Sequence, residues 1–169
     1  LINSVELQIG GTKIDKHYGR WMHIWSELTR TSEQDAFYDD CVNAHHAEYG
    51  DATKSRTLYV PLQFFCCRND GLALPLIALQ YHDVRLEFEF ETAANCFTDA
   101  TKSANLSLAN TSLLVNYIYL DSEERKRFAQ ASHEYLIEQL QFTGDESVGS
   151  SSNKIRLNFN HPCKELIWV

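Results

Sequence analysis

Histidine and carboxylate side chains provide the most direct candidate for chemistry in this sequence. His46 and Glu48 have the H-x-E spacing of cupins and non-haem iron oxygenases, in which two histidines and one carboxylate bind Fe(II) on one face. His82, His133 or His161 could supply the third ligand. Metal ligands need rigid placement, however, and His46 lies in the least regularly patterned segment. The sequence therefore favours a solvated histidine and glutamate over a metal site.

Other catalytic patterns are incomplete. His133 and Glu134 are adjacent, but the second histidine of the H-E-x-x-H zinc motif does not follow them. The chain has no nucleophile elbow, no phosphate-binding loop and no dinucleotide fingerprint. We therefore expect a non-enzymatic protein with no catalytic residues, no cofactor-binding residues and no metal site.

The cysteine content favours free thiols. The number of cysteines is odd, and no C-x-x-C pair occurs, which is typical of a reducing compartment. Adjacent Cys66 and Cys67 could form a strained vicinal disulfide. In an alternating strand, however, they would point to opposite sides, so we expect two buried free thiols. The five cysteines are Cys41, Cys66, Cys67, Cys96 and Cys163.

Two features of the sequence could involve carbohydrate. Asn105 and Asn110 begin N-glycosylation sequons, but such triplets often arise by chance, and no signal-peptide pattern precedes them. Trp21, Trp25 or Trp168 could form a stacking platform for a sugar. Because these tryptophans fall on periodic apolar faces, we expect them to pack in the core instead.

Length and charge limit the class of protein. A chain of 169 residues can bury a single-domain core without disulfides. Its formal charge of -8 disfavours direct nucleic-acid binding. No apolar run approaches the ~20 residues of a transmembrane helix. Because the chain begins at Leu1 and ends in the apolar run 165–169, we expect a piece truncated at both ends.

The first third of the chain predicts a hairpin and a helix. Apolar and polar residues alternate in 5–9, and Gly10-Gly11 then allows a two-residue turn before 12–14. Apolar residues at helical spacing predict a short amphipathic helix over 18–29. The polar segment 31–55 predicts a long loop with at most one helical turn, and 58–65 predicts a strand.

The middle of the chain predicts further strands. Residues 74–81 are continuously apolar, and 84–91 alternate apolar with charged side chains. No glycine or proline separates these two runs, so one bent strand and a hairpin both remain open. A polar loop over 92–112 then precedes a predicted strand over 113–120.

The last third predicts a well-marked helix and two strands. Asp121 is placed to cap a helix from Ser122 to Leu140, with Glu124 completing a capping box and Glu123 pairing with Arg127. Its polar face predicts an insertion that lies on the surface of a sandwich. After a Gly/Ser-rich linker, strands are expected over the two segments 155–160 and 164–169.

The order of these elements predicts the fold class. Many strands with two inserted helices do not match the regular strand and helix alternation of a parallel sheet. The pattern favours a mainly β protein, an antiparallel jelly-roll sandwich with inserted helices.

Six segments resemble one protein family, the major capsid proteins of nucleocytoplasmic large DNA viruses, which include phycodnaviruses, iridoviruses and their giant-virus relatives. The matching segments occur in family order and span nearly the whole chain. They are residues 10–22, 59–65, 68–84, 117–125, 133–139 and 157–168.

The resemblance implies a structural role in an icosahedral virion shell. Family members fold as a double jelly roll, and three copies form a trimeric pseudo-hexagonal capsomer. Residues 1–169 would be a single partial domain, most of the first roll, without its opening strands and without the second roll. Expected partners are two further copies, neighbouring capsomers, minor capsid proteins and, as an open option, an inner viral membrane. Assembly is expected in the cytoplasm of the infected host cell.

Two positions depart from the family pattern. Asp70 stands where the family commonly has proline, and Cys66 precedes Cys67 where an aromatic or other bulky residue is expected. Because aspartate also suits a turn, the first change affects the shape of one loop rather than the fold.

Overall fold

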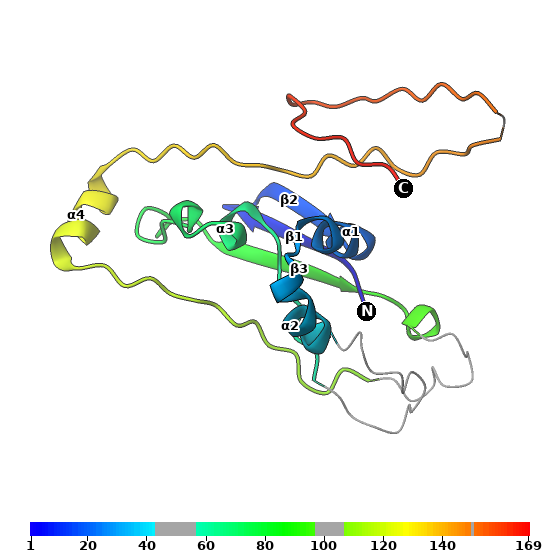
Figure 1. Ribbon diagram of the computed structural model, residues 1–169. Helices are drawn as coiled ribbons and strands as arrows, with labels where there is room; N and C mark the ends of the chain where they lie inside the picture. Colours follow the sequence, from blue (N-terminus) through cyan, green and yellow to red (C-terminus); the bar gives the residue numbers. More distant parts are fainter. Residues whose placement is uncertain (43–56, 97–106, 150) are drawn as a thin grey trace.

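The computed structural model describes residues 1–42, 57–96, 107–149 and 151–169 (Figure 1). These residues form one antiparallel sheet in the order β2-β1-β3, whose strands are β1 (Ile2–Ile9), β2 (Thr12–Tyr18) and β3 (Val84–Phe90). The helices are α1 (Gly19–Thr29), α2 (Ser32–Val42), α3 (Phe65–Arg68) and α4 (Ser122–Gln130), with short 3-10 helices η1 (Asp70–Leu72) and η2 (Ala93–Cys96).

The predicted N-terminal hairpin is confirmed. Gly10 and Gly11 have φ angles of 59° and 78°, the left-handed values that a two-residue hairpin turn needs and that glycine adopts without steric cost. The register between β1 and β2 shifts once, between Leu7 and Gln8, which marks a bulge. This shift places the buried residues of the two strands opposite one another.

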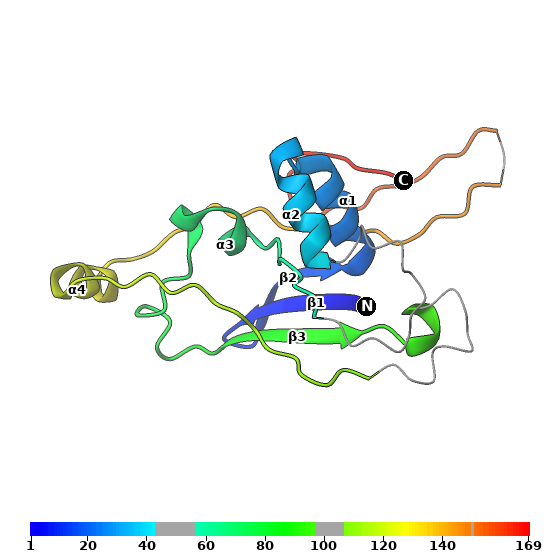
Figure 2. The ribbon, with the colours of Figure 1, turned by 60° about the horizontal axis from the view of Figure 1, so that its bottom comes forward.

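The buried face of the sheet follows from that register. Val5 lies opposite His17 on β2 and Phe88 on β3, and directly opposed residues share one face. Leu7 lies opposite Asp15 in the same way. Helices α1, α2 and α3 all lie on one side of the sheet (Figure 2). The core on that side consists of Val5, Leu7, Met22, Phe64 and Phe65.

Helix α1 confirms the prediction over 18–29, and it begins immediately after β2. A Cβ atom at Gly19 would overlap the Ile2 carbonyl oxygen, so only glycine allows the helix to start so close to β1. On the same helix, the rings of Trp21 and Trp25 lie 5.5 Å apart.

Helix α2 corrects the predicted loop over 31–55. Its three turns are held to the end of α1 by Arg30, whose guanidinium pairs with Asp35 and Asp39, each at 2.9 Å. The guanidinium also stacks on the ring of Tyr38, 4.7 Å from its centroid. These contacts are polar, which explains why apolar periodicity did not predict the helix. The rest of the predicted loop, residues 43–55, lies outside the described residues.

The predicted strand over 58–65 is wrong. The segment is extended but pairs with no strand of the described sheet, and the backbone N–H of Tyr59 donates to the Cys41 carbonyl at 2.9 Å. The chain then turns into α3, where Phe64 and Phe65 are both buried. The apolar run therefore supplies two core aromatics rather than a ladder of hydrogen bonds.

Residues 74–83 form neither a bent strand nor one arm of a hairpin. Turn hydrogen bonds run from the Ala78 N–H to the Pro75 carbonyl at 2.9 Å and from the His82 N–H to the Leu79 carbonyl at 2.8 Å. The strand itself is confirmed only from Val84 to Phe90. Before it, the Asn69 side chain caps η1 by accepting from the Gly71 N–H at 2.8 Å, so the loop containing Asp70 is a capped turn.

Helix α4 is shorter than predicted. Its cap is confirmed, since Asp121 Oδ1 accepts from the Glu123 and Glu124 N–H groups at 3.0 and 2.9 Å. Glu123 pairs with Lys126 at 3.2 Å, however, rather than with Arg127. The helix ends at Gln130, and the chain continues extended, so the prediction of a helix to Leu140 is wrong. Figure 1 shows α4 away from the sheet.

The predicted strands over 113–120, 155–160 and 164–169 are not formed in the described structure. These segments run extended, without a ladder partner, and many of their apolar side chains face solvent. Tyr119 is 92% exposed and Trp168 is 85% exposed. The described fold is therefore an antiparallel sheet with helices on one face and long extended arms.

We predict that Gly19→Ala lowers the free energy of unfolding by about 1–3 kcal/mol, because the new Cβ must displace the backbone of β1. Gly149→Ala is the matched control, since a Cβ there meets no atom within 4 Å. Thermal unfolding of both variants measures the difference. Equal stability of the two would contradict the close approach of α1 to β1.

Candidate functional site

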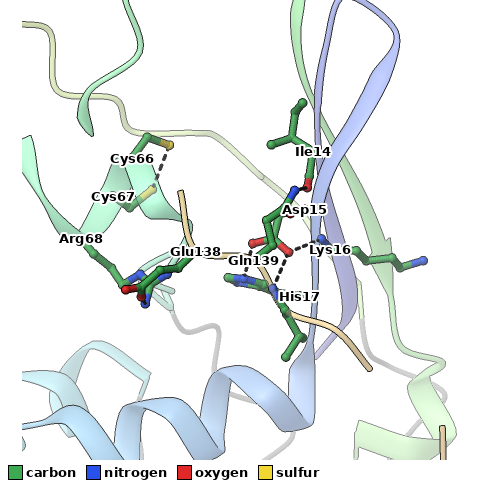
Figure 3. Close-up of polar contacts among 10 residues, drawn as sticks. Ile14, Asp15, Lys16, His17, Cys66, Cys67, Arg68, Glu138 and Gln139 are labelled. Atoms are coloured by element: carbon green, nitrogen blue, oxygen red, sulfur yellow. Dashed lines mark hydrogen bonds and ion pairs between the residues drawn. The ribbon is translucent and has the colours of Figure 1, made fainter. Parts of the chain in front are cut away.

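A buried carboxylate on β2 is the centre of a polar cluster. The side chain of Asp15 is 1% exposed. Its Oδ1 accepts from the backbone N–H of Lys16 at 2.8 Å and of Leu140 at 3.1 Å, and its Oδ2 contacts His17 Nε2 at 3.0 Å (Figure 3). A buried charge is tolerated only with such partners, so these donors hold Asp15 in place.

His17 completes the cluster on the same strand face. Its ring stacks on Phe64, with the centroids 4.4 Å apart and the planes 22° from parallel. With Nε2 directed at Asp15, Nδ1 is buried and has no hydrogen-bond partner in the described structure. A catalytic histidine would direct this second nitrogen at a nucleophile or substrate. The Asp15 and His17 pair is buried beside Phe64 in the core.

The cluster fastens a distant part of the chain to the hairpin. Gln139 Nε2 donates to the Ile14 carbonyl, next to the bond from Leu140 to Asp15. Gln141 Oε1 in turn accepts from the backbone N–H of Asn160 at 2.8 Å and of His161 at 3.1 Å. We call Asp15, His17, Gln139, Leu140 and Gln141 the polar anchor. An open hollow beside the polar anchor is lined by residues of β2, 139–142 and 158–161.

A second connection joins α1, α3 and the C-terminal arm, by which we mean the described residues after α4, 131–149 and 151–169. The Arg68 guanidinium lies over the Trp25 ring, 5.1 Å from its centroid, and pairs with Glu138 at 3.3 Å. Lys164 also pairs with Glu138. The hydrogen bond from Lys164 and the positive charges of Lys164 and Arg68 lower the pKa of the Glu138 carboxyl. Glu138 therefore stays ionised in mildly acidic solution.

The two adjacent cysteines do not point to opposite sides. Cys66 and Cys67 lie on α3, their sulfur atoms are 4.0 Å apart, and Cys67 is exposed (Figure 3). The expectation of two buried thiols on opposite sides is therefore wrong, because this segment forms a helical turn rather than a strand. All five cysteines are free in the structure.

Within the described residues, the candidate third metal ligands lie apart and make other contacts. His46 and Glu48 lie outside the described residues. His133 Nε2 contacts the Phe128 carbonyl at 2.7 Å, whereas His82 lies against the Gly10 turn and the His161 backbone binds Gln141. Among residues 1–42, 57–96, 107–149 and 151–169, no three histidine, cysteine or carboxylate side chains gather as metal ligands.

The candidate carbohydrate residues are dispersed. Asn105 lies outside the described residues, and Asn110 is exposed. Trp21 and Trp25 are half-buried on α1, whereas Trp168 is exposed on the C-terminal arm. Core packing is therefore wrong for Trp168 in this structure, since the strand that was expected to bury it is not paired.

Sequence reasoning missed the polar anchor. Asp15 and His17 lie opposite Leu7 and Val5 only because the register shifts at the bulge between Leu7 and Gln8. A regular two-residue hairpin would pair Leu7 with Ile14 and Val5 with Lys16, so the turn sequence alone directs Asp15 and His17 to the other face. Their partner Leu140 donates through its backbone, which leaves no signal in the side-chain pattern.

Comparison with known protein families shows which family this chain belongs to. The profile described as "Major capsid protein N-terminus" matches residues 1–121, and that described as "Large eukaryotic DNA virus major capsid protein" matches residues 124–169. The chain belongs to the major capsid protein family. The predicted family membership is therefore confirmed, and the polar anchor is part of a capsid protein.

Curated relatives support the family along the whole chain. The chain is 57% identical to the major capsid protein of Pyramimonas orientalis virus and 50% identical to that of Phaeocystis pouchetii virus, each over all of its length. It is 45% identical, over 99% of its length, to the major capsid protein of Paramecium bursaria Chlorella virus 1. The chain spans 42%, 39% and 40% of these three relatives.

The fold is similar to that of a solved viral capsid structure. A quasi-atomic structure of the PBCV-1 virus capsid matches 96% of the chain with a TM-score of 0.66 and 38% identity, and the match covers 40% of that protein. Among the helices of the described capsid residues, none has the length and apolar character needed to cross a bilayer.

Removing the Asp15 carboxylate tests the polar anchor. We predict that Asp15→Ala costs ~3 kcal/mol or more, because His17 and two backbone N–H groups lose their acceptor. Asp83→Ala is the control: its side chain is 87% exposed, so we expect a change within about 0.5 kcal/mol. Chemical denaturation compares the two variants, and limited proteolysis reports release of the arm at Leu140. Equal stability and equal cleavage would show that the anchor does not hold the arm.

Proposed function

We propose that this chain is part of a structural major capsid protein that folds as a jelly roll and forms trimeric, pseudo-hexagonal capsomers of an icosahedral virion shell. The observation that carries the proposal is the match of two capsid families to almost the whole chain, together with the likeness to a capsid structure. Residues 1–169 would form most of the first roll of a double jelly roll.

The extended arms support the jelly-roll proposal. Ile155, Leu157 and Phe159 alternate with polar residues, which is the pattern of a strand with one buried face. Ile155 and Leu157 are both 49% exposed in this chain, a costly arrangement for apolar side chains. Because the chain spans about two fifths of its relatives, the rest of the capsid protein has ample length to supply partner strands.

The composition supports a structural role without direct genome contact. The charge of -8 opposes binding to phosphate backbones, and the family relatives are named as capsid proteins. We therefore propose a non-enzymatic protein whose partners are two identical copies, neighbouring capsomers and minor capsid proteins. Contact with an inner viral membrane and assembly in the host cytoplasm belong to the same proposal.

The oligomeric state tests this proposal. We expect the full-length capsid protein to form discrete trimers in size-exclusion chromatography with light scattering. The isolated 169-residue chain should aggregate or fold only partly, because its extended arms expose apolar side chains and unpaired backbone groups. A full-length protein that stayed monomeric at high concentration would contradict the capsid proposal.

Two variants in the same experiment test whether residues 155–160 form a strand with one buried face. Leu157→Asp should abolish trimers of the full-length protein, because it places a charge on the proposed buried face. Asn158→Asp introduces the same carboxylate one residue later, on the opposite face, and should leave trimers intact. Equal behaviour of the two variants would argue against a strand over 155–160.

A further inference from the structure

Helix α3 holds two adjacent thiols that belong neither to the polar anchor nor to the connection from Arg68 to Glu138. Cys66 and Cys67 have their sulfur atoms 4.0 Å apart and directed toward each other (Figure 3). Cys67 is exposed and Cys66 is half-buried, so a small oxidant in solution meets Cys67 first. The other described cysteines have no thiol contact of this kind.

The electrostatic surroundings make the two thiols unequal. The hydrogen bond from the Cys66 thiol, a backbone hydrogen bond at Phe64 and the charge of Arg68 lower the pKa of Cys67 to about 7. The same hydrogen bond, burial and the neighbouring thiolate raise the pKa of Cys66. Near neutral pH, Cys67 is therefore the nucleophilic thiolate and Cys66 the protonated neighbour.

We propose that Cys66 and Cys67 form a dithiol modification site, in which hydrogen peroxide oxidises Cys67 and Cys66 resolves the product to a vicinal disulfide. The Cys67 sulfur attacks one peroxide oxygen, the O–O bond breaks, and the released hydroxide takes a proton to form water. The Cys66 sulfur then attacks the sulfenic sulfur of Cys67. The S–S bond forms, the S–O bond breaks, and the thiol proton leaves in a second water. Two thiols lose two electrons in total, and one molecule of hydrogen peroxide gains them.

The position of the pair gives the modification a structural consequence. Adjacent Cα atoms lie ~3.8 Å apart, below the usual span of a disulfide, so the oxidised form is strained and easily reduced. Helix α3 is a single turn without a side-chain cap, and such a turn is easily remodelled. Because α3 also carries buried Phe65 and the Arg68 bridge to Glu138, oxidation loosens the contact between the core and the C-terminal arm.

Peptide mass spectrometry of the full-length protein tests the proposal. Trypsin releases residues 57–68, whose only cysteines are Cys66 and Cys67, and residues 157–164, which contain Cys163 alone. After brief exposure to hydrogen peroxide at neutral pH, peptide 57–68 should lose two hydrogen atoms and regain them with a thiol reductant. Its oxidation should accelerate as the pH rises through about 7. The Cys163 peptide provides the exposed single-thiol comparison and should react more slowly.

Two variants assign the roles within the pair. Cys66→Ser should leave a Cys67 sulfenic acid that a dimedone probe traps, and Cys67→Ser should leave Cys66 unreacted under the same conditions. In the oxidised protein without substitutions, peptide 57–68 could gain oxygen instead of losing two hydrogen atoms. That result would overturn the proposal. So would an oxidation rate no faster than that of the Cys163 peptide.

Discussion

The structure depends on burying one face of β1, the central strand of the described sheet. Val5 and Leu7 are 0% and 2% exposed, and they pack with Phe64 and Phe65. Because the hairpin register fixes which residues of β2 share this face, a carboxylate and an imidazole are buried with them. Burying Asp15 without partners would cost several kcal/mol, so the apolar core forms only together with the donors of the polar anchor.

This requirement links distant parts of the chain. The backbone donor at Leu140 lies 125 residues from Asp15 in sequence, and Gln141 then holds the segment around Asn160. Arg68 adds a parallel connection through Glu138. Polar contacts, together with Ile137 packed against the core, thus position the C-terminal arm, while other apolar side chains of the arm, such as Leu136 and Val169, remain exposed. That division suits a segment that completes a larger capsid fold.

Local signals in the sequence predicted the elements that form locally. Gly10-Gly11 set the hairpin turn, the tryptophan spacing marked α1, and Asp121 capped α4, all within a few residues. The predictions that failed depended on distant partners. The segment after Gln130 has helical apolar spacing, but it runs extended, and its Leu140 N–H binds Asp15 instead of a helical carbonyl. Helix α2 was missed because ion pairs of Arg30, rather than an apolar stripe, hold it.

The central claim is that the extended arms become paired strands in the complete capsid protein, and hydrogen–deuterium exchange tests it most directly. Amides of β1 should be protected both in the isolated chain and in the full-length trimer, since their partners lie within this chain. Amides of 113–120 and 155–160 should exchange rapidly in the isolated chain and slowly in the trimer. Rapid exchange of both segments in the trimer would contradict the account, because no sheet would then have formed around them.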